Sequence, residues 1–124
     1  MSVLITAAMD ALADRLADHT ERPVTTDPSR VSATPCVLVE PPQVEPTGTL
    51  CGAQLYRFTV LCIGLPGARA ELAPLADLLE EITGALDDLG IGWTLAEPVA
   101  YVPLQDAAAA DPCQAYRITV EEMD

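Results

Sequence analysis

The residues of this chain with the greatest capacity for chemistry are its carboxylates, one histidine and four cysteines. Acidic residues cluster at Glu80-Glu81, at Asp87-Asp88 and at the C-terminus as Glu121-Glu122 and Asp124. Two carboxylates can act as general acid and base when a protected pocket raises the pKa of one of them. Alternating acids around a glycine turn can bind calcium. Neither a protected pocket nor a glycine turn accompanies these pairs. Because adjacent residues of a helix point about 100° apart, we expect the paired acids to form solvated surface.

The histidine and the cysteines lack the spacing of a metal site. The cysteines, Cys36, Cys51, Cys62 and Cys113, show no C-x-x-C pattern, and no cysteine lies near His19 in the sequence. Cys36 and Cys62 lie in apolar runs, where a reduced cysteine behaves as a small hydrophobic side chain. We expect buried thiols there and an exposed, structural His19. A Cys51–Cys113 disulfide would need a close approach that the sequence leaves open.

The common nucleotide-binding and hydrolase signatures are absent from the sequence. It contains no G-x-x-x-x-G-K-[ST], G-x-G-x-x-G, G-x-S-x-G or H-E-x-x-H motif. Leu65-Pro66-Gly67, which precedes a helical pattern, is the nearest approach to a phosphate loop. Without lysine it is predicted to be a plain turn. We therefore expect no catalytic residues, no cofactor and no metal, and the chain is predicted not to be an enzyme.

The composition combines strong acidity with the apolar content of a folded domain. Of 124 residues, 19 are acidic and six are basic, all six being arginine, for a net charge of −13, while 50% are hydrophobic. Such a surface repels free nucleic acid, phosphorylated metabolites and anionic membranes. The length predicts a single domain over residues 1–124.

The first residues and the apolar runs predict neither a secretory signal nor a membrane span. Residues 1–6 lack the basic start and long apolar run of a secretory signal, and no stretch approaches the ~20 apolar residues of a membrane span. We expect no membrane association, and a protein that is cytosolic or released by lysis.

The first helical pattern runs from residue 3 to residue 19. Its apolar residues recur at helical spacing as Ile5, Met9, Leu12 and Leu16. The opposite face carries acids at four-residue intervals, namely Asp10, Asp14 and Asp18. An amphipathic helix with an acidic outer face is predicted, and Glu21-Arg22-Pro23 ends it, because the residue before a proline disfavours helical geometry.

The second helical pattern is the clearest periodicity of the chain. Its leucine and isoleucine residues step by alternating intervals of three and four: Leu72, Leu75, Leu79, Ile82, Leu86 and Leu89. Pro74 fits only near the helix start, and Gly90 is a natural stop. This pattern predicts a core helix.

Five segments are predicted to be strands, at residues 24–26, 36–40, 53–63, 93–102 and 116–121. In 53–63 the even-numbered residues from Tyr56 to Cys62 are apolar and should face the helices, while Arg57 and Thr59 mark a wetter face. The order α-β-β-β-α-β-β predicts an α+β fold. It has a mainly antiparallel sheet of four to five strands with two helices packed on one face. Residues 105–112 are predicted to be a loop, although their four alanines could form a helical turn.

Two surface features point to assembly, and the alternative is an ordinary surface loop and a proline-protected edge. The proline-rich segment from Pro41 to Thr49 is predicted to be an exposed connection or a hairpin tip, and loops of this length are usually functional or disordered. Strands near Pro98 and Pro103 are predicted to be edges to which another subunit could add. The predicted interface residues are Pro41, Pro42, Val44, Glu45, Thr47 and Pro98.

Four segments in this order of elements carry a family resemblance. They are Val24-Thr25-Thr26-Asp27-Pro28, Pro35-Cys36-Val37-Leu38-Val39-Glu40-Pro41-Pro42, Tyr56-Arg57-Phe58-Thr59-Val60 and Ala115-Tyr116-Arg117-Ile118-Thr119-Val120. The chain resembles, over nearly its whole length, the tail-terminator proteins of long-tailed phages. It is also similar to neighbouring minor tail or neck proteins of phages that infect high-GC actinobacteria. The absence of lysine agrees with a high-GC coding bias.

The resemblance implies a non-enzymatic ring, typically a hexamer, that caps the finished tail tube and joins it to the head-side connector. Its partners would be further copies of itself, the tail tube protein and a connector or stopper protein. It would be assembled in the host cytoplasm and located in the tail or neck of the virion. DNA would pass through without specific binding, since an acidic lumen does not retain phosphates, and the lumen candidates are Asp10, Asp14, Asp18 and Glu45. A minor tail or neck stopper subunit and a small assembly chaperone or binding protein are the alternatives.

Overall fold

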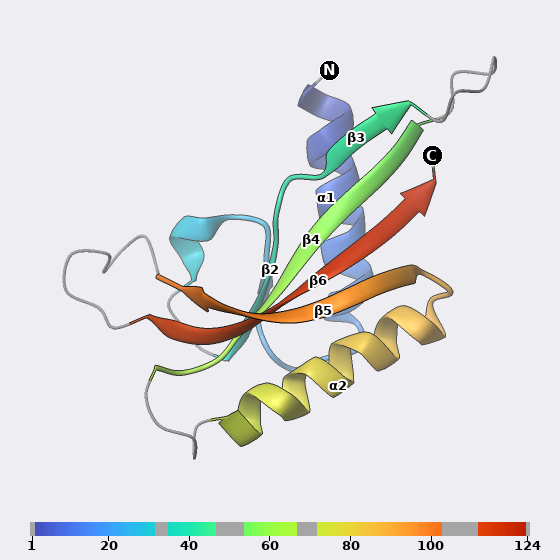
Figure 1. Cartoon of the computed structure of the whole chain (residues 1–124). Helices are drawn as coiled ribbons and strands as arrows, with labels where there is room; N and C mark the ends of the chain where they lie inside the picture. Colours follow the sequence, from blue (N-terminus) through green and yellow to red (C-terminus); the bar gives the residue numbers. More distant parts are fainter. Residues whose placement is uncertain (1, 32–34, 47–53, 67–71, 103–111, 124) are drawn as a thin grey trace.

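A computed structural model describes residues 2–31, 35–46, 54–66, 72–102 and 112–123 of the chain (Figure 1). Within these ranges the elements follow in this order: α1 Ser2–Ala17, β1 Val24–Thr25, the 3-10 helix η1 Pro28–Arg30, β2 Cys36–Val39, β3 Gln43–Pro46, β4 Gln54–Ile63, α2 Leu72–Asp88, β5 Gly92–Tyr101 and β6 Cys113–Met123. Neither of these two α-helices is long and apolar enough to cross a membrane.

The strands form one sheet in the order β1-β2-β4-β6-β5, and β3 pairs with β4 on the same side as β2. β1 runs parallel to β2, and every other pair of described strands is antiparallel. The predicted α+β class, with a mainly antiparallel sheet and two helices, is confirmed. The described part of the sheet has six strands, one more than the upper predicted number.

The additional strand is β3, where the sequence predicted an exposed connection or a hairpin tip. Its four residues pair with the first four residues of β4, so this segment is one arm of a hairpin. Pro41-Pro42 interrupts the strand but does not reverse the chain, because β2 and β3 both run antiparallel to β4. The prediction failed because the segment is polar and proline-rich, a composition that edge strands tolerate. The predicted tip, including Thr47, lies outside the described residues.

The main core lies between the two helices and one face of the sheet, which we call the helix face. It contains the predicted apolar stripe of α1 and, from β4, the residues that were predicted to face the helices: Tyr56, Phe58, Val60 and Cys62. In α2, Leu75, Ile82 and Leu86 are buried as predicted. Leu72, at the first position of α2, is instead 37% exposed.

A second, smaller core lies on the opposite, open face of the sheet. It is formed by Cys36, Leu38, Leu61, Ile63, Cys113 and Ala115, with Val31 packed against them. Val31 follows directly after η1 and is buried, whereas η1 itself has no buried residue. Only the other half of the open face, around Arg57 and Thr59, is polar. The predicted wetter face is therefore confirmed for half of its length.

The two glycines near the end of α2 predict opposite effects of alanine. Gly90 has φ of +72°, and Ile91 N–H donates to the Leu86 carbonyl at 2.9 Å, which closes the helix. Alanine at Gly90 is expected to lower the free energy of unfolding by about 1–2 kcal/mol, because a Cβ disfavours this left-handed conformation. Gly84 lies inside α2 with nothing within 4 Å of an added Cβ. Alanine there is expected to raise stability by about 0.5–1 kcal/mol. Urea denaturation of both variants tests this prediction. Changes of the same sign in the free energy of unfolding would contradict it.

Candidate functional site

The two acidic pairs of α2 form solvated surface, as predicted. Glu80, Glu81, Asp87 and Asp88 are all exposed on α2. The Asp87 carboxylate accepts a hydrogen bond from Trp93 Nε1 at 3.1 Å, so it ties the end of α2 to the start of β5. Within the described residues, no group of three or more His, Cys, Asp or Glu side chains could hold a metal ion.

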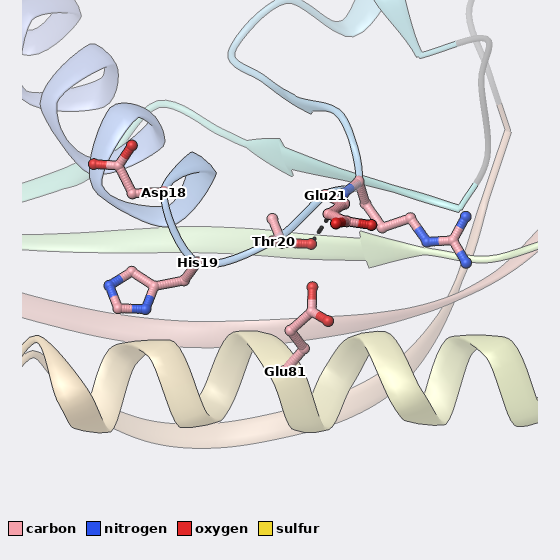
Figure 2. A pocket seen from close by; sticks show the side chains of 6 residues that line it. Asp18, His19, Thr20, Glu21 and Glu81 are labelled. Atoms are coloured by element: carbon pink, nitrogen blue, oxygen red, sulfur yellow. Dashed lines mark hydrogen bonds between the residues drawn. The ribbon is translucent and has the colours of Figure 1, made fainter.

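A polar hollow lies between the end of α1 and the middle of α2 (Figure 2). Its lining residues are Asp18, His19, Thr20, Glu21, Arg22 and Glu81. Glu81 reaches from α2 toward the segment after α1, whereas His19 and Glu21 point in different directions. Thr20 Oγ1 accepts a hydrogen bond from the Arg22 main-chain N–H at 3.1 Å. A catalytic site needs its acid, base or nucleophile to converge on one reacting atom, and these exposed side chains do not. His19 is exposed, as predicted.

The described cysteines, Cys36, Cys62 and Cys113, are buried free thiols. The pKa of Cys36 is raised to about 11, mainly by burial and to a smaller extent by the neighbouring Cys113. The pKa of Cys62 is raised to about 12, mainly by burial and to a smaller extent by the neighbouring Cys36. Reactive cysteines need a lowered pKa and partial exposure, so these thiols have a packing role. Cys51 lies outside the described residues.

On the polar half of the open face, Arg57 and Arg117 form ion pairs with neighbouring glutamates. Arg57 Nη1 lies 3.0 Å from Glu45 Oε1, and Arg57 Nε lies 3.4 Å from Glu121 Oε1. Arg117 Nη2 lies 2.6 Å from Glu97 Oε1. Such partly exposed pairs contribute about 0–1 kcal/mol each. Their consequence is electrostatic, since the two arginines already have carboxylate partners and offer little attraction to a phosphate.

These ion pairs were not predicted from the sequence, although it contains a signal for them. Arg57 stands directly opposite Glu121, and Glu97 directly opposite Arg117, in antiparallel pairs. Opposite charges at such cross-strand positions attract one another. The strand register determines which residues become opposite, and the register is not visible in one strand alone.

The structure divides the predicted lumen acids between two sides of the molecule. Asp10 and Asp14 are exposed on α1, and Asp18 is exposed directly after the end of this helix. Glu45 lies on the open face, where it pairs with Arg57. The four acids therefore do not form one surface within a single copy.

The predicted interface residues also separate. Pro41 and Pro42 lie at the break between β2 and β3, and Val44 is 36% exposed on β3. Pro98 is exposed on β5, the end strand of the sheet, which confirms the predicted edge position. β3 and β5 lie on opposite sides of the sheet, with β4 and β6 between them (Figure 1). These residues cannot meet within one copy.

An apolar groove borders the β5 edge where α2 begins. Its lining includes Leu72 and Leu75 of α2, Pro98 and Ala100 of β5, and Tyr116 of β6. The groove was not predicted, because it joins the start of one helix to two strands that follow much later in the sequence. Leu72, at the start of the leucine stripe, is the only residue of that stripe that is exposed in the described helix, and it lines this groove.

The described surface thus offers free edges, an apolar groove and internally paired charges, an arrangement suited to binding another protein chain. No protein-family model matches the chain, and no curated protein matches it significantly.

Proposed function

We propose that this chain is a structural subunit of a long-tailed phage. Copies of it assemble into a ring, of the hexameric kind that the family resemblance implies, which ends the tail tube and joins it to the head-side connector. The observation that carries the proposal is the ten-residue strand β5, whose outer edge has no partner strand among the described residues. A long free edge is a template for pairing with another chain.

The side chains near this edge support association more than chemistry. Leu95 is 51% exposed on the open face of β5, and the apolar groove borders the same strand on the helix face, at Pro98 and Ala100. The charged side chains nearby, Glu97 and Arg117, are paired with one another. Exposed apolar surface along an edge strand promotes aggregation of a monomer, whereas in an assembly the same surface is buried against another subunit.

Both faces of the sheet suit a ring through which DNA passes. The helix layer presents Asp10, Asp14 and Asp18, which repel phosphates. The open face presents arginines whose charge Glu45, Glu97 and Glu121 already balance. Neither surface would release many counterions on contact with a duplex, so neither would retain it.

Size-exclusion chromatography with light scattering tests the proposal, together with negative-stain microscopy. The expected result is a discrete oligomer with a ring-shaped outline, formed either by the chain alone or after addition of a tail tube protein. A monomer at high concentration under both conditions would refute the ring. A stable complex of one copy with one partner would instead indicate the stopper or chaperone alternative.

A further inference from the structure

The second core, on the open face, has a much thinner cover than the main core. Two helices, of 16 and 17 residues, lie over the main core. Over the second core packs Val31, at the end of the short segment of residues 27–31, which we call the strap. Within the strap only Val31 is buried, at 1% exposure, whereas residues 27–30 are exposed. A single buried side chain therefore anchors the strap to the sheet.

The hydrogen bonds that shape the strap are local. The Arg30 N–H donates to the Asp27 carbonyl at 3.0 Å, and the Val31 N–H donates to the Pro28 carbonyl at 3.3 Å. The Asp27 carboxylate accepts from the Ser29 N–H at 3.0 Å and from the Ser29 hydroxyl at 2.8 Å, which caps η1. These bonds fix the shape of the strap, but they do not tie it to the strands.

The chain is held firmly by the sheet just before the strap begins. β1 pairs with β2 through Val24 and Thr25, and the Val37 N–H donates to the Pro23 carbonyl at 2.8 Å. A segment with few buried apolar side chains and local hydrogen bonds opens at a lower cost in free energy than the core of a domain. The strap can therefore lift from the sheet by a turn of the chain at Thr26, while β1 and β2 stay paired.

Two buried cysteines lie under these different covers at almost the same place in the sheet. Cys36 stands opposite Ile63, and Val37 stands opposite Cys62, in the antiparallel pair of β2 and β4. Because successive residues of a strand point to opposite faces, Cys36 belongs to the second core and Cys62 to the main core. A reagent in solution can thus reach Cys36 when the strap lifts, but it reaches Cys62 only when the helix layer comes away.

We propose that the strap is a releasable cover, which opens by local unfolding while the main core stays folded and which then exposes Cys36 and the apolar half of the open face. The surface that it hides includes Leu38, Leu61 and Ile63. The strap thereby controls whether this half of the sheet is accessible from solution. The inference goes beyond the proposed ring and does not depend on it, since it concerns a device within one copy.

Labelling of the folded wild type with iodoacetamide tests this proposal, with each cysteine followed by peptide mass spectrometry. The reagent is slow, so the labelling rate reports the equilibrium population of the open form. At pH 8, Cys36 should be labelled at least about a hundred-fold faster than Cys62. Low urea concentrations should hardly change the rate at Cys36 but should raise it steeply at Cys62, because release of the strap exposes little surface and unfolding of the main core exposes much. Equal rates with equal urea dependence would overturn the proposal.

Two variants test whether the strap is what protects Cys36. Val31→Ala removes the anchor and should raise the labelling rate of Cys36 at least about ten-fold. Asp27→Ala removes the cap of η1 from an exposed position and should raise this rate about three-fold or more. Thr20→Ala is the matched control for Asp27→Ala, because Thr20 Oγ1 likewise accepts a main-chain N–H, but outside the strap. It should leave the rate at Cys36 unchanged. A rate that neither strap variant changes would contradict the proposal.

Val120→Ala is the matched control for Val31→Ala, since Val120 is equally buried but lies in the main core. The contacts of Val120 are kept when the strap lifts. Its truncation should therefore accelerate the labelling of Cys62, through unfolding of the main core, and leave the rate at Cys36 as in the wild type. The same acceleration at both cysteines would show that Cys36 becomes accessible only by global unfolding, and the releasable strap would be wrong.

Discussion

Replacing Phe58 with alanine is expected to lower the free energy of unfolding by about 3–5 kcal/mol. Phe58 is the largest of the fully buried side chains, with 0% exposure, and it lies on the helix face of β4. Its ring meets the ring of Tyr56 edge to face, with centroids 6.2 Å apart and an interplanar angle of 77°. Truncation removes this contact and leaves a cavity that both helices and the sheet must partly fill. Urea denaturation followed by circular dichroism measures the loss.

Leu95→Ala is the matched control for this prediction. Leu95 is also a large hydrophobic residue of the sheet, but it is 51% exposed on the edge strand. Its truncation should change the free energy of unfolding by no more than about 0.5 kcal/mol. A Phe58→Ala cost as small as that of Leu95→Ala would show that the main core is not packed between the helices and β4. The free edges would then lack the rigid support that assembly requires.

The second large effect is a loss of stability at alkaline pH caused by Cys62. Burial raises the pKa of this thiol in the folded state to about 12, from its ordinary value of 9.0. Below pH 9 both states hold the proton, so the full stability is present. As the pH rises above 9 the unfolded chain releases the proton and the folded chain does not. Stability is therefore lost progressively up to about pH 12.

Cys62→Ala isolates this contribution. Between pH 8 and pH 10.5 the wild type should lose about 2 kcal/mol more of its free energy of unfolding than the variant does. The wild type and the variant must be compared at several pH values, because the truncation itself changes the free energy of unfolding by an amount that does not depend on pH. Denaturation curves at several pH values separate the two effects. Parallel pH profiles for the two proteins would contradict the burial of this thiol.

Local periodicity alone was enough to predict the elements that build the core. The leucine and isoleucine spacing of α2 and the alternation from Tyr56 to Cys62 are each satisfied by one buried face, so the pattern specifies both the element and its inner side. Gly90 was correctly predicted as the end of α2, because few residues other than glycine adopt its positive φ.

Only the tertiary structure decided what the surface presents. β3 is a strand because β4 provides a partner for its main chain, and its proline-rich composition gave no sign of this. The ion pairs of Arg57 and Arg117 depend on strand register, and the groove beside Pro98 depends on where α2 begins over β5 and β6. The sequence determined which side chains turn inward, because burial is repeated along each segment. The edges and grooves arise between segments far apart in the chain, so their positions were set only when the sheet was assembled.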